Sequence, residues 1–245
     1  PGASGVMAYP LPQSARDWQS KMRAFTDEHL IAWEVEAEMN DGFIPQDAFD
    51  AIHAATKAMG LYFPSIPTDG GGAGLTKLEI ATIQEQVGRS TNGMWACYSD
   101  LSPFLYHTAN DHQMEHYVNP MLEQGKRVAY AITELGAGSD VDAIEATAVK
   151  DGNGYVLNGV KLHVTGANLS DWLVFQAKLE DGKHALFYVD MTAQGVTTIR
   201  TPRYTHNFRG HHLLMKFEDV HVTADDMIDA DGDGMNDKIY RYQHD

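Results

Sequence analysis

In Tyr130-Ala-Ile-Thr-Glu-Leu-Gly-Ala-Gly-Ser-Asp140 an apolar run is followed at once by a glycine-rich turn, and this stretch is the most informative part of the sequence. Tyr130-Ala-Ile-Thr133 is apolar and partly β-branched, which predicts a buried strand. The glycines after it allow a sharp turn and bring backbone N–H groups close to a ligand. Thr133 and Ser139 add hydroxyls that can donate to ring or phosphate oxygens. The stretch predicts a strand and a turn suited to an anionic, planar cofactor, and a plain tight loop between strands is the alternative.

Downstream of this stretch the signals are those of strands and hairpins. Asp151-Gly-Asn-Gly154 and Asn158-Gly159 are turn sequences, with the strand-like Tyr155-Val-Leu157 between them. Further strands are expected at residues 172–178, 184–189, 196–200 and 213–220.

Upstream, the hydrophobic pattern has the helical period. Apolar positions three and four apart predict helices at residues 15–38, 46–59, 77–89 and 113–124. The period changes once, near residue 126, which predicts an all-α domain over residues 1–126 and a β-barrel-like domain over residues 127–226. The fold class expected is therefore α+β.

The amino-acid composition limits the classes of partner that this chain is expected to bind. The 245 residues, 43% of them hydrophobic, can bury a substantial core. A net charge of −16 argues against nucleic acid and anionic membranes as partners, and a solvated surface accounts for most of the carboxylates. No apolar run approaches the ~20 residues of a membrane span. A single cysteine, Cys97, permits no internal disulfide and fits a reducing compartment.

A resemblance to a known family adds to this interpretation. The opening stretch, together with Asn158-Gly-Val-Lys-Leu-His-Val-Thr-Gly166, resembles the flavin-cradling core of the acyl-CoA dehydrogenases. Further matches follow in the family's order and cover nearly the whole chain: Ile66-Pro-Thr-Asp-Gly-Gly-Gly-Ala-Gly-Leu75, Thr82-Ile-Gln-Glu-Gln-Val-Gly-Arg-Ser90, Tyr117-Val-Asn-Pro-Met-Leu-Glu-Gln-Gly125 and Phe217-Glu-Asp-Val-His-Val222. The resemblance implies that residues 227–245 form a linker and the start of a C-terminal four-helix bundle, before which this chain is truncated.

The resemblance implies an oxidoreductase that uses FAD. Such an enzyme introduces an α,β double bond into an acyl-CoA thioester and passes the electrons to an electron-transferring flavoprotein. It would be a homo- or hetero-oligomer in the bacterial cytoplasm or the mitochondrial matrix. Carried over by position, the residues that contact the flavin are Tyr130, Ile132, Thr133, Gly138, Ser139, His163, Val164 and Thr165. Those expected near the substrate are Ser139, Trp95 and Leu101, with Met94, Tyr98 and Leu105 as further lining. For all of these except Ser139, an ordinary place in the helix core is the alternative.

Departures from the family pattern matter as much as the matches. His163 stands where the family usually has Trp or Phe against the flavin, and it brings a group that titrates near pH 6.5 when unperturbed. A partly buried, hydrogen-bonded histidine without a redox role is the alternative. Leu135 replaces a common proline, which is expected to loosen the turn. His211 and His212 are adjacent in a predicted strand and would point to opposite faces, so they predict no metal site.

The catalytic base is not assigned. The family's usual glutamate has no counterpart in this chain, and Glu134 belongs to the fixed loop. Asp245 comes into register with an alternative base position of some members, and a solvated terminal acid is the other interpretation. A non-catalytic or half-site subunit, acting with a partner chain that carries the bundle and the base, therefore stays open. So does a monooxygenase that uses the same flavin pocket.

The acidic tail has a competing interpretation. Asp229, Asp231 and Asp233 have the spacing of the first ligands of a calcium loop. Position 12 of that loop is Tyr240 rather than an acidic ligand, so an acidic linker is expected instead of a metal site.

Overall fold

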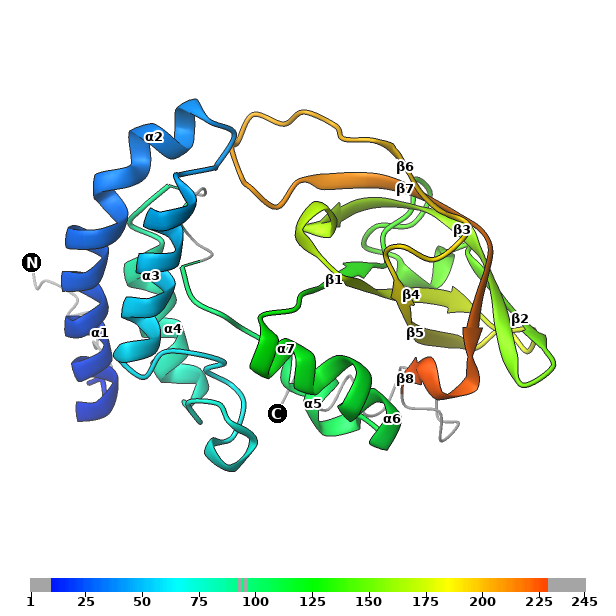
Figure 1. The fold of residues 1–245 in the computed structure, drawn as a ribbon, viewed down its shortest axis with the longest axis horizontal. Coiled ribbons are helices and arrows are strands. Elements are labelled where there is room, and N and C mark those ends of the chain that lie inside the picture. Colours follow the sequence, from blue (N-terminus) through cyan, green and yellow to red (C-terminus); the bar gives the residue numbers. More distant parts are fainter. Residues whose placement is uncertain (1–9, 92–93, 95–96, 229–245) are drawn as a thin grey trace, which may run out of the picture. The chain divides into compact units, whose positions relative to one another are not determined.

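The structure is a computed structural model that describes residues 10–91, 94 and 97–228. It divides after Asp100 into two compact units, whose elements are labelled in Figure 1. Each unit has a hydrophobic core of its own. The elements of the first unit are α1 (Gln13–Phe25), the π-helical turn η1 (Thr26–Leu30), the 3-10 turn η2 (Ile31–Trp33), α2 (Glu34–Met39), α3 (Gln46–Ala58), the 3-10 turn η3 (Thr68–Gly70) and α4 (Lys77–Val87).

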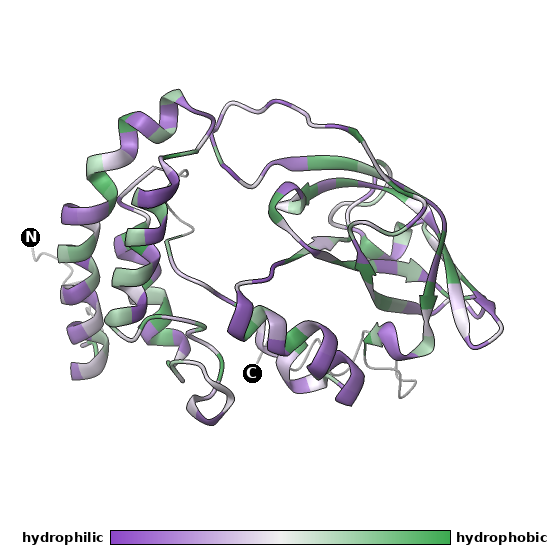
Figure 2. Cartoon of the chain, viewed as in Figure 1, coloured by the Kyte–Doolittle hydropathy of each residue, from purple (hydrophilic) through white to green (hydrophobic). Residues whose placement is uncertain are grey.

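Amphipathic helices build the first unit. Along α1, α3 and α4, polar and apolar positions alternate in Figure 2, and the apolar ones meet in a core that contains Met22, Leu30 and Ile83. A capping box starts α4, because the Thr76 hydroxyl accepts from the Glu79 amide at 3.3 Å and the Glu79 carboxylate accepts from the Thr76 amide at 2.8 Å.

The prediction of a single helix over residues 15–38 is wrong, because the structure divides this range into α1, η1, η2 and α2. The helical hydrogen-bond pattern widens to a π turn at Thr26 and tightens to a 3-10 turn at Ile31 before α2 begins. Thr26 and Leu30 are both fully buried, so the wider turn still presents one face to the core. Hydrophobic periodicity reports that face and cannot distinguish α from π geometry.

Short helices and an eight-stranded sheet make up the second unit. Its helical elements are α5 (Pro103–Thr108), α6 (Asp111–Gln113), the π-helical turn η5 (Met114–Val118), α7 (Asn119–Gln124), and the 3-10 turns η6 (Val141–Ala143), η7 (Ala167–Leu169) and η8 (Ala224–Asp226). Its strands are β1 (Val128–Ala131), β2 (Thr147–Asp151), β3 (Gly154–Thr165), β4 (Trp172–Lys178), β5 (His184–Asp190), β6 (Val196–Arg200), β7 (His212–Thr223) and β8 (Met227–Ile228).

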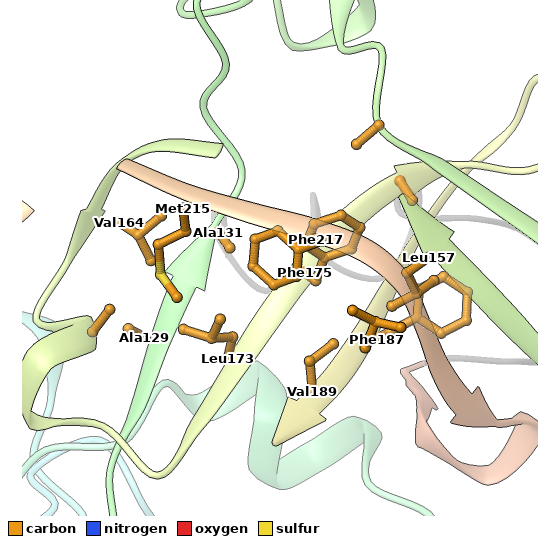
Figure 3. Close-up of a cluster of buried hydrophobic side chains, with 14 of the residues drawn as sticks. Ala129, Ala131, Leu157, Val164, Leu173, Phe175, Phe187, Val189, Met215 and Phe217 are labelled. Atoms are coloured by element: carbon orange, nitrogen blue, oxygen red, sulfur yellow. The ribbon is translucent and has the colours of Figure 1, made fainter. Parts of the chain in front are cut away.

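The strand order is β6-β7-β3-β2-β4-β5-β8, and β1 pairs in parallel with β4 (Figure 1). The inward side chains meet in the core drawn in Figure 3, where the rings of Phe175 and Phe217 lie 4.4 Å apart. A helical part followed by a β part is therefore confirmed, and so are the strands expected at 172–178 and 196–200. The division into domains 1–126, 127–226 and 227–245 stays a prediction. The type of element changes between α7 and β1, whereas the compact units divide earlier.

Two local predictions are wrong. Asn158-Gly159 is no turn, because it lies within β3 at a shift of its register with β7. There the Asn158 side chain accepts from the Asp219 amide at 3.0 Å and donates to the Asp219 carboxylate at 3.2 Å. A Cβ on Gly159 would lie 2.6 Å from Cβ of Ala146, so only glycine fits the bulge. The strand expected to run to Thr133 ends at Ala131.

Candidate functional site

The glycine-rich turn after β1 is closed by its own backbone. The Glu134 amide donates to the Ala137 carbonyl at 2.9 Å, and the Ala137 amide donates back to the Glu134 carbonyl at 3.2 Å. Leu135, at the tip, is 79% exposed. A Cβ added at Gly136 or Gly138 would meet no atom within 4 Å, so the outer side of the turn is open to a ligand.

A buried ion pair anchors this turn to β3. Lys161 is fully buried, and its Nζ donates to the Glu134 carboxylate at 2.7 Å and to the Ile132 carbonyl at 2.9 Å. The Glu134 carboxylate also accepts from the amides of Glu145 at 2.6 Å and Ala146 at 3.0 Å. One carboxylate at the start of the turn therefore links it both to β3 and to the segment before β2.

The ion pair sets the charge states of its members. Burial raises the pKa of Glu134, but the hydrogen bonds from Lys161, Glu145 and Ala146 outweigh it and bring the pKa below its usual value. Burial lowers the pKa of Lys161, and Glu134 partly offsets that effect. Glu134 is thus an ionised structural group.

The two segments singled out by the sequence lie side by side. Leu162 donates its amide to the Thr133 carbonyl at 2.8 Å, directly beside the Lys161 contacts. Along this end of β3, Val164 is fully buried in the core, whereas His163 and Thr165 are exposed. Any contact of Val164 with a ligand would therefore come from its backbone.

His163 belongs to a group of side chains that we call the imidazole cluster: His163, Thr165, Tyr204, His206 and His212. The His163 backbone is left-handed, with φ of 55°, at an irregularity in the β3–β7 register. Its Nδ1 lies 2.6 Å from the Tyr204 hydroxyl. The Thr165 hydroxyl lies 2.7 Å from Nδ1 of His212, and the Nε2 atoms of His206 and His212 are 2.8 Å apart. Sequence reasoning missed Tyr204 and His206, whose segment carries no recognisable motif.

Some of the predicted donors are free and one is engaged. Within residues 97–228, the hydroxyls of Thr133 and Ser139 and the amides of Gly138 and Ser139 make no hydrogen bond. The Thr165 hydroxyl, by contrast, is bonded to His212. The turn therefore offers several unpaired donors on one short stretch, and Thr133 is better placed than Thr165 to donate to a ligand. Beside them, Tyr130 and Ile132 are partly buried.

The remaining candidates belong to both units or lie outside the described residues. Leu101 and Leu105 are buried in the second unit, and Met94 and Tyr98 belong to the core of the first. Trp95, Asp229, Asp231, Asp233 and Asp245 lie outside the described residues.

The described part of the chain contains no group of three or more His, Cys, Asp or Glu side chains placed to hold a metal ion. Of the helices described, none combines the length and the apolar character that a membrane crossing needs.

Two family models match the chain. The model of the acyl-CoA dehydrogenase N-terminal domain covers residues 12–125, and that of the acyl-CoA dehydrogenase middle domain covers residues 129–220.

Curated relatives are similar over part of their length. A 3-(aryl)acrylate reductase of Clostridium sporogenes is 36% identical over 148 residues, which cover 56% of this chain and 39% of the relative. A probable medium-chain specific acyl-CoA dehydrogenase of Caenorhabditis briggsae is 26% identical over 93% of this chain and 57% of the relative. A caffeyl-CoA reductase-Etf complex subunit of Acetobacterium woodii is 30% identical over 71% of this chain and 47% of the relative. The chain thus spans between 39% and 57% of these relatives.

Solved structures share the fold. A probable acyl-CoA dehydrogenase from Mycobacterium abscessus matches with a TM-score of 0.78 at 25% identity, covering 94% of this chain and 62% of that one. Butyryl-CoA dehydrogenase from Megasphaera elsdenii matches with a TM-score of 0.76 at 20% identity, covering 95% of this chain and 62% of that one.

Proposed function

The chain belongs to the acyl-CoA dehydrogenase family, whose N-terminal and middle domains it carries, and from this premise we propose that it binds FAD and serves the α,β-dehydrogenation of an acyl-CoA thioester. The observation that carries the proposal is the open turn at residues 133–139, anchored beside the exposed end of β3. Its unpaired N–H and O–H donors suit the carbonyl oxygens and the phosphates of a flavin nucleotide.

The donors have a chemical task in such a reaction. A bound flavin supplies the two-electron chemistry, and the protein supplies orientation and electrostatics. The Thr133 hydroxyl and the amides of Gly138 and Ser139 would donate to the ring and stabilise the negative charge that reduction places on it. The Glu134–Lys161 pair holds these donors in place before the ligand arrives. We propose no residue of the described part as the base, because Glu134 is committed to Lys161.

The names of the relatives support the proposed class of reaction. One relative is named a dehydrogenase and two are named reductases, which supports an oxidoreductase that acts on a carbon–carbon bond. We propose acyl-CoA as the substrate and an electron-transferring flavoprotein as the electron partner, in an oligomeric enzyme of the bacterial cytoplasm or the mitochondrial matrix. One relative's name includes such an Etf complex.

Anaerobic titration tests the proposal. The chain should bind FAD in a saturable manner, and the flavin absorbance should bleach when a matching acyl-CoA is added. Absence of FAD binding would contradict the proposal. FAD binding without bleaching by acyl-CoA, combined with rapid peroxide formation in air, would point to oxygen chemistry instead.

A further inference from the structure

The imidazole cluster joins three parts of the second unit. His163 and Thr165 come from the end of β3, Tyr204 and His206 from the segment before β7, and His212 from the first position of β7. The rings also pack on one another. Tyr204 stacks on His206 with centroids 5.5 Å apart and meets His212 edge-on at 4.9 Å.

The partner of His163 serves both charge states of the imidazole. A tyrosine hydroxyl can donate or accept. Neutral His163 can accept at Nδ1 from the Tyr204 hydroxyl, which leaves the proton of the neutral ring on Nε2. Imidazolium His163 can donate from Nδ1 to the same oxygen after the hydroxyl has rotated. Tyr204 therefore orients the ring of His163 without fixing its charge.

The neighbours of His163 supply no negative charge. His206 and His212 face each other through their Nε2 atoms, so one of them must donate and the other accept. Burial lowers the pKa of His212, and the imidazoles of His206, His163 and His211 lower it further. Within residues 97–228, no carboxylate is hydrogen-bonded to His163, His206 or His212.

Within three residues of the cluster along the chain, the charged side chains besides histidine are Lys161, Arg203 and Arg209, all of them cationic. Lys161 of β3 is turned into the core, where it pairs with Glu134 of the turn. A proton added to the cluster therefore finds hydrogen-bond partners but no hydrogen-bonded carboxylate, and a new negative charge beside it would favour protonation.

The cluster adjoins the proposed flavin site. His163 follows Leu162, whose amide is bonded to the Thr133 carbonyl at the start of the open turn. This step rests on the proposed function. Reduction of the bound flavin would place a negative charge beside imidazoles that have no hydrogen-bonded carboxylate of their own.

We propose that the imidazole cluster takes up one proton when the bound flavin is reduced, with His163 as the proton acceptor and Tyr204 as the residue that positions it. Two electrons come from the substrate or, in the test, from dithionite. The proton comes from solvent and forms an N–H bond on His163, and no group leaves. The positive charge gained by His163 then balances the charge gained by the flavin.

The pH dependence of the flavin reduction potential tests this. Over the range in which His163 takes up the proton, the FAD-loaded wild-type chain should bind one proton more per two electrons than His163→Asn. That difference makes the reduction equilibrium constant change an extra tenfold per pH unit, which equals about 30 mV for a two-electron couple. Asparagine is a suitable replacement because it tolerates the left-handed backbone at this position. His221→Asn, an exposed histidine elsewhere on β7, is the control and should keep the wild-type slope.

A second variant guards against misfolding of the first. Tyr204→Phe keeps the aromatic packing and removes only the hydroxyl, so it should move the pH at which the slope changes. In the flavin-free chain it should also shift the ring nitrogen resonances of His163 in an NMR titration, while those of His221 stay unchanged. Equal potentials at every pH in wild type, His163→Asn and Tyr204→Phe would overturn the inference and leave the proposed function standing. Failure of the wild-type chain to bind FAD would sink the proposed function and the inference with it.

Discussion

Lys161 and Glu134 show how much one buried pair contributes to the candidate site. Lys161→Met keeps the length of the side chain and leaves the Glu134 carboxylate in the core without its cation. Breaking a buried pair from one side costs about 3–5 kcal/mol, so the free energy of unfolding from urea titration should fall by that amount.

The matched control for this variant is a pair on the surface. Lys216 and Glu218 lie 2.8 Å apart, with their side chains 43% and 64% exposed. Lys216→Met should therefore cost at most about 1 kcal/mol. Equal losses in the two variants would contradict the anchoring role of Lys161.

The hydroxyls of the turn give a second prediction at this scale. Thr133→Ala combined with Ser139→Ala should weaken FAD binding by roughly 2–4 kcal/mol, taking about 1–2 kcal/mol for each lost hydrogen bond. Isothermal titration calorimetry measures the change. Thr197→Ala with Thr198→Ala removes two exposed hydroxyls of β6 and should leave the affinity unchanged. If the turn variant binds as tightly as wild type, the flavin site lies elsewhere.

The sequence predicted which residues belong to the candidate site better than it predicted which side chains they contact. The motif identified Thr133, Ser139 and His163 as neighbours of one site, and the structure brings their segments together. Tyr204 could not be found, because it lies 41 positions from His163 in a segment without a periodic pattern. The engagement of Thr165 with His212 depends on the same long-range register and was equally out of reach.

Among the loops that connect the strands, two glycines allow the cost of a left-handed backbone to be compared with the cost of a steric clash. Gly182 and Gly195 both have positive φ, of 81° and 91°. A Cβ on Gly182 would meet nothing within 4 Å, whereas one on Gly195 would lie 2.1 Å from the Glu218 carbonyl oxygen. Gly182→Ala should cost about 1–2 kcal/mol from the left-handed backbone alone. Gly195→Ala should cost a further ~1–3 kcal/mol, because β6 must move away from β7.

Thermal or urea unfolding of the two glycine variants checks this difference. Similar losses would mean that the pairing of β6 with β7 yields freely, contrary to the close approach of Gly195 to Glu218.

Element type was easier to predict than element boundaries. β4 and β6 have the expected bounds because their sequence patterns end at polar or turn residues. Asn158-Gly159 shows the limit, since the same dipeptide suits a hairpin turn or a bulge. The choice was made by Asp219 on β7 and by the close approach of Ala146. Both lie far from the dipeptide in sequence.

For the whole molecule, the pKa shifts predict a plateau of stability. Burial lowers the pKa of His184 and His212 from 6.5, so the unfolded chain takes up protons first and stability falls as the pH drops below that value. Hydrogen bonds keep the pKa of Glu134 and Asp226 low, which extends the loss below about pH 4.5. Burial raises the pKa of Cys97 from 9.0 to about 12, so stability is lost again as the pH rises above 9.

Urea midpoints measured from pH 4 to pH 10 test the plateau. We expect the highest midpoints between about pH 6.5 and pH 9, the range set by these pKa shifts. A midpoint that rises as the pH falls below about 6.5 would have the wrong sign for both histidines and both carboxylates, and one that rises above pH 9 would have the wrong sign for Cys97.

Native mass spectrometry of the chain mixed with FAD is the decisive test of FAD binding at the turn of residues 133–139. It counts bound flavins and subunits in the same spectrum. We expect one FAD per chain in wild type and loss of most of that signal in Thr133→Ala with Ser139→Ala. Spectra without FAD at any concentration, or with equal FAD in the wild type and in that variant, would contradict FAD binding at this turn.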